Sequence, residues 1–407
     1  MVSKYDVFYV VAAKGPLKVS EIVKTLNKSE KEYQNIFNNV LLLEKEVLIR
    51  RNGQVEVIDN EKAKALLKLI FFCNNNSINY NILFDVNMLD FLEKTSKKEF
   101  FTIRTVRIHP QTFKKYVLIL LKYGFLVQYS KKPLKCKLLK HKFIMSLLSF
   151  FDRNLDFYNS KHKSCVEKIK KELLLFKTNQ KNSYSILEEM EKKNEAKFIH
   201  LSLNMEGNPL TLPETQKIID NKIAPAMRSL EHVHEVENYK KALDMMILTA
   251  NQKKSLDLNL ILEYHRTAMA HMHGAGALRK QNVRIKLNPS FKTSDWQLIS
   301  LKLNKLLDDY NNFDSKDIKK IVEYASFFHN EFQRIHPFID GNSRTVRLLL
   351  LHFLRERNIP IFDIPIGYFD VYMDLTKKSE VRNDKAFALM LQEIILADLT
   401  RLNVNSY

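Results

Sequence analysis

Residues 336–347 read HPFIDGNSRTVR, and this segment holds several groups that phosphate chemistry needs. A histidine side chain titrates near neutral pH, so His336 is a candidate general base for removing a proton from a hydroxyl. Asp340 offers the hard oxygen that Mg2+ prefers, usually alongside water and substrate phosphates. The segment therefore predicts a site for transfer of a phosphoryl or nucleotidyl group.

The residues after Asp340 predict a turn followed by a helix. Gly341 and Asn342 suit a tight turn, because both tolerate a positive φ better than most residues. Residues 343–356 lack Gly and Pro and are rich in Leu and Arg, which favours a helix beginning at this turn. The N–H groups of its first turn would face an anion, and Arg344 and Arg347, three residues apart, could grip phosphate oxygens.

Each of these features alone has a simpler explanation, because His-Pro and Asp-Gly-Asn are common in turns and arginines three apart often form a solvated face. Together, at this spacing, they resemble the signature of the Fic family, His-x-Phe-x-Asp/Glu-Gly-Asn-Gly/Lys-Arg-x-x-Arg. Residues 234–239 with Ala242, residues 262–265 and residues 276–279 also follow the order typical of Fic cores. The resemblance covers residues 198–375 and implies a mainly α fold, with an all-α core and a small β-hairpin flap.

The resemblance implies a role for each residue of the signature. His336 would activate a Ser, Thr or Tyr hydroxyl of a target protein for attack on the α-phosphate of ATP. Asp340 would hold Mg2+ between the α- and β-phosphates, and the backbone of residues 341–343 would cradle phosphate oxygens. Arg344 would bind the β-phosphate and Arg347 the γ-phosphate. Catalysis is thus assigned to His336, Asn342 and Arg344, with ATP and Mg2+ as cofactors.

One position departs from the family pattern, because Ser343 stands where Gly or Lys is usual. Its backbone N–H is retained, but a positive φ there would cost about 1 to 2 kcal/mol for a residue with a Cβ. We expect transfer activity to be preserved, with its efficiency and nucleotide choice open.

Residues 202–208 read SLNMEGN and resemble the motif Ser/Thr-x-x-x-Glu-Gly/Asn that inhibits part of the family. The resemblance implies that Glu206 pairs with Arg347, so the γ-phosphate loses its partner and self-inhibition is the default state. The same glutamate would align a water that removes AMP from a modified target. The structural alternative is a carboxylate at a helix N-terminus. The motif positions are Ser202, Glu206, Gly207 and Asn208.

Apolar residues alternate at positions 283, 285 and 287, which predicts a short strand or hairpin before Pro289. By resemblance this is the flap, which would hold a target segment by main-chain pairing. Any edge hairpin shows the same alternation. The flap residues assigned to the nucleotide site are Ile285, Lys286, Leu287 and Asn288.

Tyr372 is a candidate for stacking on the adenine, with an ordinary core position as the favoured alternative. Three histidines, at positions 265, 271 and 273, do not predict a metal site. On a helix, residues 271 and 273 point in about opposite directions, and no carboxylate follows at ligand spacing. We expect His265 to be a packed core residue.

Basic residues are concentrated in the first half of the chain. Residues 1–200 contain 37 Lys and Arg against 21 Asp and Glu, which makes an acidic partner such as nucleic acid a reasonable expectation there. Three predicted helices, at residues 3–13, 19–26 and 29–46, precede a hairpin around Asn52-Gly53. This order is typical of a winged helix-turn-helix, with residues 29–39 as its recognition segment.

A second copy of the pattern follows, with a helix from Pro110 to Tyr123 and a turn at residues 131–133. Residues 101–150 contain eleven Lys and Arg and no Asp or Glu, so we expect this module to contact double-stranded DNA. Winged helices also bind proteins, and a protein partner is the alternative. The candidate DNA contacts are Arg104, Arg107, Lys114, Lys115, Lys131 and Lys132.

The length of 407 residues predicts two or three domains. Three scattered cysteines fit a reducing compartment, no apolar run reaches the ~20 residues of a membrane span, and no secretory signal is visible. We therefore expect a cytoplasmic protein, with a homodimer left open. The predicted segments are two winged-helix (α+β) modules (1–60 and 61–145), connecting helices (146–197), the Fic domain (198–375) and a helical extension (376–407).

Two classes of function follow. The first is a self-inhibited protein adenylyltransferase with a basic N-terminal module. The second is a DNA-binding transcriptional regulator whose Fic domain senses nucleotide and is catalytically weak. The intact His336, Asp340, Asn342 and both arginines favour the enzyme.

Overall fold

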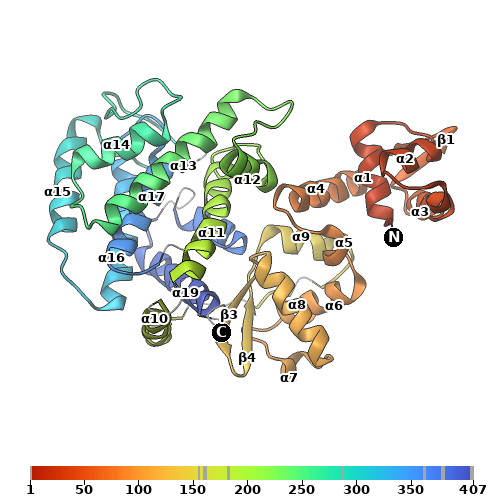
Figure 1. The fold of residues 1–407 in the computed structure, drawn as a ribbon, viewed down its shortest axis with the longest axis horizontal. Helices are drawn as coiled ribbons and strands as arrows, with labels where there is room; N and C mark the ends of the chain where they lie inside the picture. Colours follow the sequence, from red (N-terminus) through yellow and green to blue (C-terminus); the bar gives the residue numbers. More distant parts are fainter. Residues whose placement is uncertain are drawn as a thin grey trace. The chain divides into compact units, whose positions relative to one another are not determined.

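A computed structural model describes residues 2–154, 156–158, 163–180, 184–285, 288, 290–360, 364–376 and 381–403. These residues are mainly helical, which confirms the prediction of a mainly α fold, and they contain two antiparallel hairpins (Figure 1). The chain divides into two compact units, Met1–Lys98 with Lys142–Tyr158, and Glu99–His141 with Asn159–Tyr407.

The first unit begins with three helices and a hairpin, in the order that the sequence predicts. Ser3 caps the first helix by accepting a hydrogen bond from the N–H of Asp6, and Gly53, with φ of 75°, makes the turn between the two strands. The main chains of Leu17 and Val55 pair beside this hairpin. The elements are α1 (Lys4–Lys14), α2 (Val19–Thr25), η1 (Glu30–Glu32), α3 (Tyr33–Lys45), β1 (Ile49–Asn52), β2 (Gln54–Val57), α4 (Glu61–Asn75), α5 (Tyr80–Leu83), α6 (Val86–Ser96) and α9 (Lys142–Phe150).

The second unit opens with two helices and a hairpin, α7 (Ile103–Val106), α8 (Pro110–Lys122), β3 (Leu126–Lys131) and β4 (Leu134–Leu138). A large helical body follows. Its elements are α10 (Val166–Gln180), α11 (Tyr184–Asn204), α12 (Leu212–Asn221), α13 (Leu230–Asn251), α14 (Leu258–Ala268), η2 (Trp296–Leu298), α15 (Ile299–Asn311), α16 (Ile318–Ile335), α17 (Asn342–Glu356), η3 (Ile366–Tyr368), α18 (Phe369–Leu375) and α19 (Asp384–Leu402).

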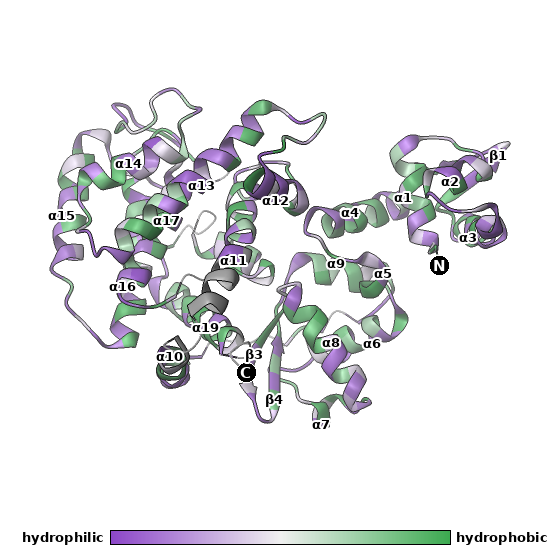
Figure 2. Ribbon diagram, in the orientation of Figure 1, coloured by the Kyte–Doolittle hydropathy of each residue, from purple (hydrophilic) through white to green (hydrophobic). Residues whose placement is uncertain are grey.

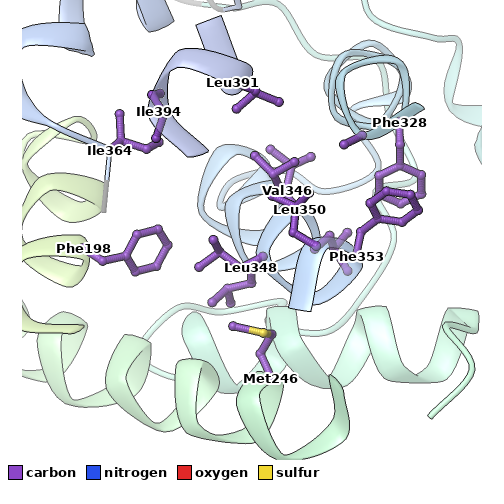
Figure 3. Packing of buried hydrophobic residues seen from close by; sticks show 14 of the residues in the cluster. Phe198, Met246, Phe328, Val346, Leu348, Leu350, Phe353, Ile364, Leu391 and Ile394 are labelled. Atoms are coloured by element: carbon purple, nitrogen blue, oxygen red, sulfur yellow. The ribbon is translucent and has the colours of Figure 1, made fainter. Parts of the chain in front are cut away.

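Helix α17 lies at the centre of the helical body. Its residues 342–354 are all buried, as expected of a helix with neighbours on every side. Figure 3 shows Val346, Leu348 and Phe353 of α17 among side chains from surrounding helices, including Met246 of α13 and Phe328 of α16. Outer helices such as α13 and α15 instead carry both hydrophilic and hydrophobic segments (Figure 2). The packing fixes α17 and therefore the position of its N-terminus, which lies within the 336–347 segment.

The hairpin β3–β4 belongs to the same unit as the helical body because it packs on α19. The buried carboxylate of Glu393 on α19 accepts hydrogen bonds from the hydroxyl of Tyr129 at 2.6 Å and from Nζ of Lys137 at 3.0 Å. The hydroxyl of Tyr368 donates to the same carboxylate at 2.7 Å. The residues of the predicted 61–145 module are thus divided between the two units. Among the described residues, no helix is long and apolar enough to cross a membrane.

Candidate functional site

The turn after α16 presents His336. This residue caps α16 in the left-handed conformation, with φ of 51°, and its Nδ1 lies 3.1 Å from the carbonyl oxygen of Gln333. Because a carbonyl oxygen only accepts, Nδ1 carries the hydrogen and the ring's lone pair is on Nε2. In the neutral ring, the basic nitrogen is therefore Nε2.

Arg279 also holds this turn. Its Nε donates to the carbonyl of His336 at 2.7 Å, and its Nη1 donates to the carbonyl of Gln281 at 2.7 Å. Nη2 donates to the carbonyl of Ser294, and the side chain is only 3% exposed. A planar guanidinium with several fixed partners orients the turn more firmly than a single bond would. The role of Arg279 as a clamp is visible only from the tertiary contacts.

The loop between His336 and α17 is closed by Asn342. Its Oδ1 accepts from the N–H of Phe338 at 2.9 Å, and its Nδ2 donates to the carbonyl of Phe338 at 2.8 Å. The side chain that the sequence assigns to catalysis therefore fixes the loop, while the residue itself begins α17.

Gly341 allows the loop to approach α14 closely. Its φ is 76°, and an added Cβ would lie 2.8 Å from the Cγ and Sδ atoms of Met269. His265 accepts from the N–H of Gly276 through Nδ1, so Nε2 carries the hydrogen and donates to the carbonyl of Asp340 at 2.9 Å. Burial lowers the pKa of His265 to about 4, so the ring is neutral at physiological pH. The prediction that His265 is a packed residue is confirmed, since it is 4% exposed.

Ser343 lies within α17, and the structure corrects the expectation of strain at this position. Among the described residues, the left-handed positions of the 336–347 segment are His336 and Gly341, and Ser343 has helical backbone. Gln333 donates to its hydroxyl at 3.2 Å. The departure from the family pattern therefore carries no cost from a positive φ, because the left-handed residue is Gly341, two positions before Ser343.

Arg344 lies between two acids. Its Nη1 is 3.1 Å from Oε1 of Glu235 on α13, and its Nη2 is 3.1 Å from Oδ2 of Asp340. The Arg344 side chain is 4% exposed, whereas that of Asp340 is 54% exposed. Asp340 is thus open to an ion or ligand from outside, whereas Arg344 is buried. The sequence does not predict Glu235, because its separation from Arg344 in the chain hides the contact.

Arg347, one helical turn further on, is enclosed by residues 202–206. Its Nε donates to Oγ of Ser202 at 3.1 Å, and its Nη2 donates to the Ser202 carbonyl at 2.8 Å and to Oε1 of Glu206 at 3.1 Å. Burial opposes the charge of Arg347, but nearby Tyr372, Glu206 and Tyr239 more than offset this and raise its pKa. Gly207 follows with φ of 98°. The Glu206–Arg347 contact implied by the resemblance is present.

A cavity of about 300 Å3 joins several of these groups. Of the residues singled out from sequence, His336, Asp340, Asn342, Ser343, Glu206 and Ile285 line it. The other lining residues were not assigned to the nucleotide site from the sequence, and they are Val283 and Arg284 of the predicted flap, Ile339 of the 336–347 segment, and Phe291, Gln333, Met373 and Thr376. No pattern in the sequence marks Met373 or Thr376, which come from the end of α18.

The flap is described only in part, since Lys286 and Leu287 lie outside the described residues. In the part described, Val283 to Ile285 and Asn288 are not in a strand, so the predicted hairpin is absent there. The carbonyl of Val283 instead accepts a hydrogen bond from a side chain, Oγ1 of Thr293, at 3.0 Å. In a hairpin it would usually accept from the main chain of the paired strand.

Tyr372 lies inside the core and does not line the cavity. It is 1% exposed, its hydroxyl is 3.0 Å from Nε2 of His329, and its ring packs edge-on against that imidazole. A ring so enclosed cannot offer a face to an adenine, so the structure favours the ordinary core position for this residue.

The candidate DNA contacts form a basic surface in the second unit, which we define as Arg104, Arg107, Lys114, Lys115, Lys131 and Lys132. All but the half-buried Lys131 are exposed, and none of the six forms an ion pair with a described residue. In the first unit, the exposed charges of the predicted recognition segment 29–39 are Glu30 and Lys31, which cancel. Phosphate contacts are therefore expected on α7, α8 and the β3–β4 turn.

Comparisons with known proteins agree with the resemblance. Residues 255–354 match the family model described as the Fic/DOC family. A protein named Protein adenylyltransferase Fic from Drosophila grimshawi is 24% identical over 304 residues, which is 72% of this chain and 60% of that protein. Its namesake from Drosophila persimilis is 27% identical over 219 residues, which is 53% of this chain and 41% of that protein. The chain thus spans less than two thirds of these relatives.

Two solved structures share the fold. A Fic domain containing signaling protein from Bacteroides thetaiotaomicron superposes with a TM-score of 0.54 at 24% identity, covering 59% of this chain and 96% of that one. Fic-1 from C. elegans superposes with a TM-score of 0.51 at 16% identity, covering 84% of this chain and 97% of that one.

Proposed function

We propose that this chain is a self-inhibited protein adenylyltransferase, which moves AMP from ATP to a hydroxyl of a target protein. The observation that carries the proposal is the meeting of His336, Asp340 and the N-terminus of α17 at one cavity, with Glu206 lining the same cavity. The curated relatives named as protein adenylyltransferases support it.

The chemistry assigns one task to each group. Nε2 of His336 takes the proton from the target hydroxyl, whose oxygen then attacks the α-phosphorus of ATP. The bond from that phosphorus to the bridging oxygen breaks, and pyrophosphate leaves. Arg344 and Arg347 neutralise the charge of the departing phosphates, and the N–H groups at the start of α17 bind phosphate oxygens. Hydrolysis would remove AMP from a target: a water aligned by Glu206 would attack the phosphorus, the bond from phosphorus to the target oxygen would break, and AMP and the free target hydroxyl would be released.

Mg2+ fits the site through Asp340. Its carboxylate is the exposed acid of the cavity, and hard oxygen is the ligand type this ion takes, usually together with substrate phosphates. When bound, Mg2+ would neutralise negative charge on the α- and β-phosphates. Arg344, held on Oδ2 of Asp340, would keep the carboxylate turned toward that position.

Glu206 supplies the inhibition. Its ion pair with Arg347 occupies the cation proposed for the γ-phosphate, and its carboxylate would repel an incoming triphosphate. ATP is therefore expected to bind poorly or in an unproductive pose until residues 202–208 move away.

Two forms of labelled ATP test the activity. A Glu206→Gly variant with Mg2+ should transfer label from the α-phosphate of ATP to protein in a lysate, and should transfer none from the γ-phosphate. Adding His336→Ala should abolish the transfer. Label from the γ-phosphate would point to a kinase, and absence of any transfer would leave the nucleotide-sensing regulator as the better account.

A second proposal concerns the basic surface, which we infer binds double-stranded DNA through phosphates. Six basic side chains without ion-pair partners among the described residues favour a polyanion over an ordinary protein surface. Binding of a duplex should weaken steeply with salt, since phosphate contacts release counterions. Lys114→Glu with Lys115→Glu should weaken binding, whereas the matched change of exposed Lys305 and Lys316 to Glu should not. Salt-insensitive or absent binding would indicate a protein partner instead.

A further inference from the structure

Asn208 makes a second set of contacts between residues 202–208 and the site. Its Nδ2 donates to Oε2 of Glu235 at 2.6 Å and to the carbonyl of His232 at 3.1 Å. Its Oδ1 accepts from the N–H of Leu210 at 3.0 Å, and the residue is 5% exposed. The side chain is therefore fixed, and it fixes the carboxylate of Glu235 in turn.

Through Glu235 these contacts reach Arg344. Oε2 of Glu235 faces Asn208 while Oε1 faces Nη1 of Arg344, so one carboxylate connects the two. The other terminal nitrogen of Arg344 is on Asp340. With two acids around one guanidinium, the net charge here is negative, which opposes a phosphate even though an arginine is present.

Two histidine rings lie close to Glu235 without forming a hydrogen bond to it. Nε2 of His271 lies 3.6 Å from Oε1, and Nδ1 of His232 lies 3.9 Å from Oε2, both beyond hydrogen-bond distance. The His271 side chain is 6% exposed, and neither of its ring nitrogens has a hydrogen-bond partner in the described part of the chain. The same holds for Nδ1 of His232. A buried imidazole lacking a partner gains by donating to a carboxylate, even when neutral.

We propose that Glu235 is a positioning residue with two alternative sets of partners, which couples residues 202–208 to Arg344. At rest, Asn208 holds Glu235 against Arg344. When residues 202–208 leave, Glu235 turns to His271 and His232, and Arg344 is released to bind phosphate. One segment thus restrains both arginines, Arg347 directly through Glu206 and Arg344 indirectly through Asn208.

The coupling has a physical reason in the burial of Glu235. Its side chain is only 16% exposed, so it needs a partner in either state. If Arg344 simply moved to a phosphate, a buried carboxylate would be left next to a new anion. The two imidazoles can instead donate hydrogen bonds to this carboxylate. The proposed coupling rests on the proposed function, because it requires that Arg344 binds a phosphate of ATP.

Calorimetric titration with ATP and Mg2+ tests the coupling in a double-mutant cycle. Glu235→Gln removes the negative charge that faces Arg344. It should tighten ATP binding about fivefold, which is the effect of losing a contact worth about 1 kcal/mol. Asn208→Ala should tighten it less, and should add nothing in the Glu235→Gln background, because it acts through Glu235. The control is Glu237→Gln, on the same helix, which should leave the affinity unchanged.

A second variant covers the case in which Asn208→Ala does not fold. In a Glu206→Gly background, His271→Leu removes an alternative partner of Glu235 and should weaken ATP binding several-fold, with an unchanged melting temperature. The proposal is overturned if Glu206→Gly binds ATP but Glu235→Gln does not tighten binding, or if the effects of Asn208→Ala and Glu235→Gln multiply. Absence of ATP binding in every variant, Glu206→Gly included, would instead remove the proposed function and this coupling with it.

Discussion

Arg347 and Glu206 form an ion pair inside the protein, with Nη2 of the arginine 3.1 Å from Oε1 of the glutamate. The side chains are 1% and 17% exposed, so the pair is largely removed from water. Arg347 sits one turn from the start of α17, and Glu206 lines the cavity there. A phosphate that binds Arg347 in place of Glu206 would have to displace this carboxylate, and the proposed self-inhibition rests on that competition.

Arg279 should affect the chemical step more than nucleotide binding. Arg279→Lys keeps the charge but loses the fork that holds the carbonyls of His336 and Gln281. In a Glu206→Gly background, kcat should fall about tenfold or more, because a small misplacement of a base is costly, while KM for ATP changes little. Exposed Lys292→Ala is the control. A rise in KM alone would mean that Arg279 serves nucleotide binding.

Gly341→Ala should destabilise the fold through a steric clash as well as through φ. The new Cβ would meet Met269 at 2.8 Å and Nε2 of His265 at 3.1 Å. We expect a loss of about 1 to 3 kcal/mol in the free energy of unfolding, measured with urea. Gly274→Ala is a matched control, since Gly274 has φ of 83° but no atom within 4 Å of the added Cβ. Equal losses in the two variants would show that the clash is relieved.

Ser343→Gly should not improve the enzyme. Because Ser343 has helical backbone, glycine relieves no strain there and removes the hydroxyl that accepts from Gln333. Stability should fall by up to about 1 kcal/mol, and ATP affinity in a Glu206→Gly background should change less than about twofold. A large gain in activity would mean that the serine side chain itself obstructs the nucleotide.

The protein should lose stability in mild acid. Burial lowers the pKa of His200 and His265 to about 4 and that of His329 to about 3, against an ordinary 6.5. Between the ordinary pKa of 6.5 and these lowered pKa values, the unfolded chain therefore binds more protons than the folded chain. The free energy of unfolding thus falls as the pH drops below about 6.5, and it continues to fall to about pH 4.

Urea unfolding at about pH 7.5 and about pH 5 checks this expectation, because carboxylates with lowered pKa values titrate below that window. Replacing the exposed His273 with Gln should leave the pH dependence unchanged. Equal stability at the two pH values would show that these three imidazoles are protonated in the folded protein.

The helical core and the turn before α17 could be predicted because they depend on local patterns. The run from Ser343 to Glu356 predicts α17, and the spacing of His336, Asp340 and Gly341 predicts the turn before it. The contact of Glu206 with Arg347 was expected only through the resemblance, since 141 positions separate the two residues.

What could not be predicted depends on tertiary packing. Glu235 lies far along the chain from Arg344, and Arg279 lies far from His336, whose carbonyl it holds. The C-terminal end of α18, which supplies Met373 and Thr376 to the cavity, carries no motif. The hairpin β3–β4 joins the helical body because Glu393 collects three buried donors from separate segments. Neither hydrophobic periodicity nor local composition predicts that these three donors contact one carboxylate.

The most direct measurement is the initial rate of AMP transfer from ATP and Mg2+, compared between the unaltered chain and Glu206→Gly. Inhibition by Glu206 predicts a rate at least about tenfold higher in the variant, equivalent to about 1.4 kcal/mol of lost inhibition, and no transfer when His336→Ala is added. Equal rates with and without Glu206, or transfer that survives His336→Ala, would contradict it.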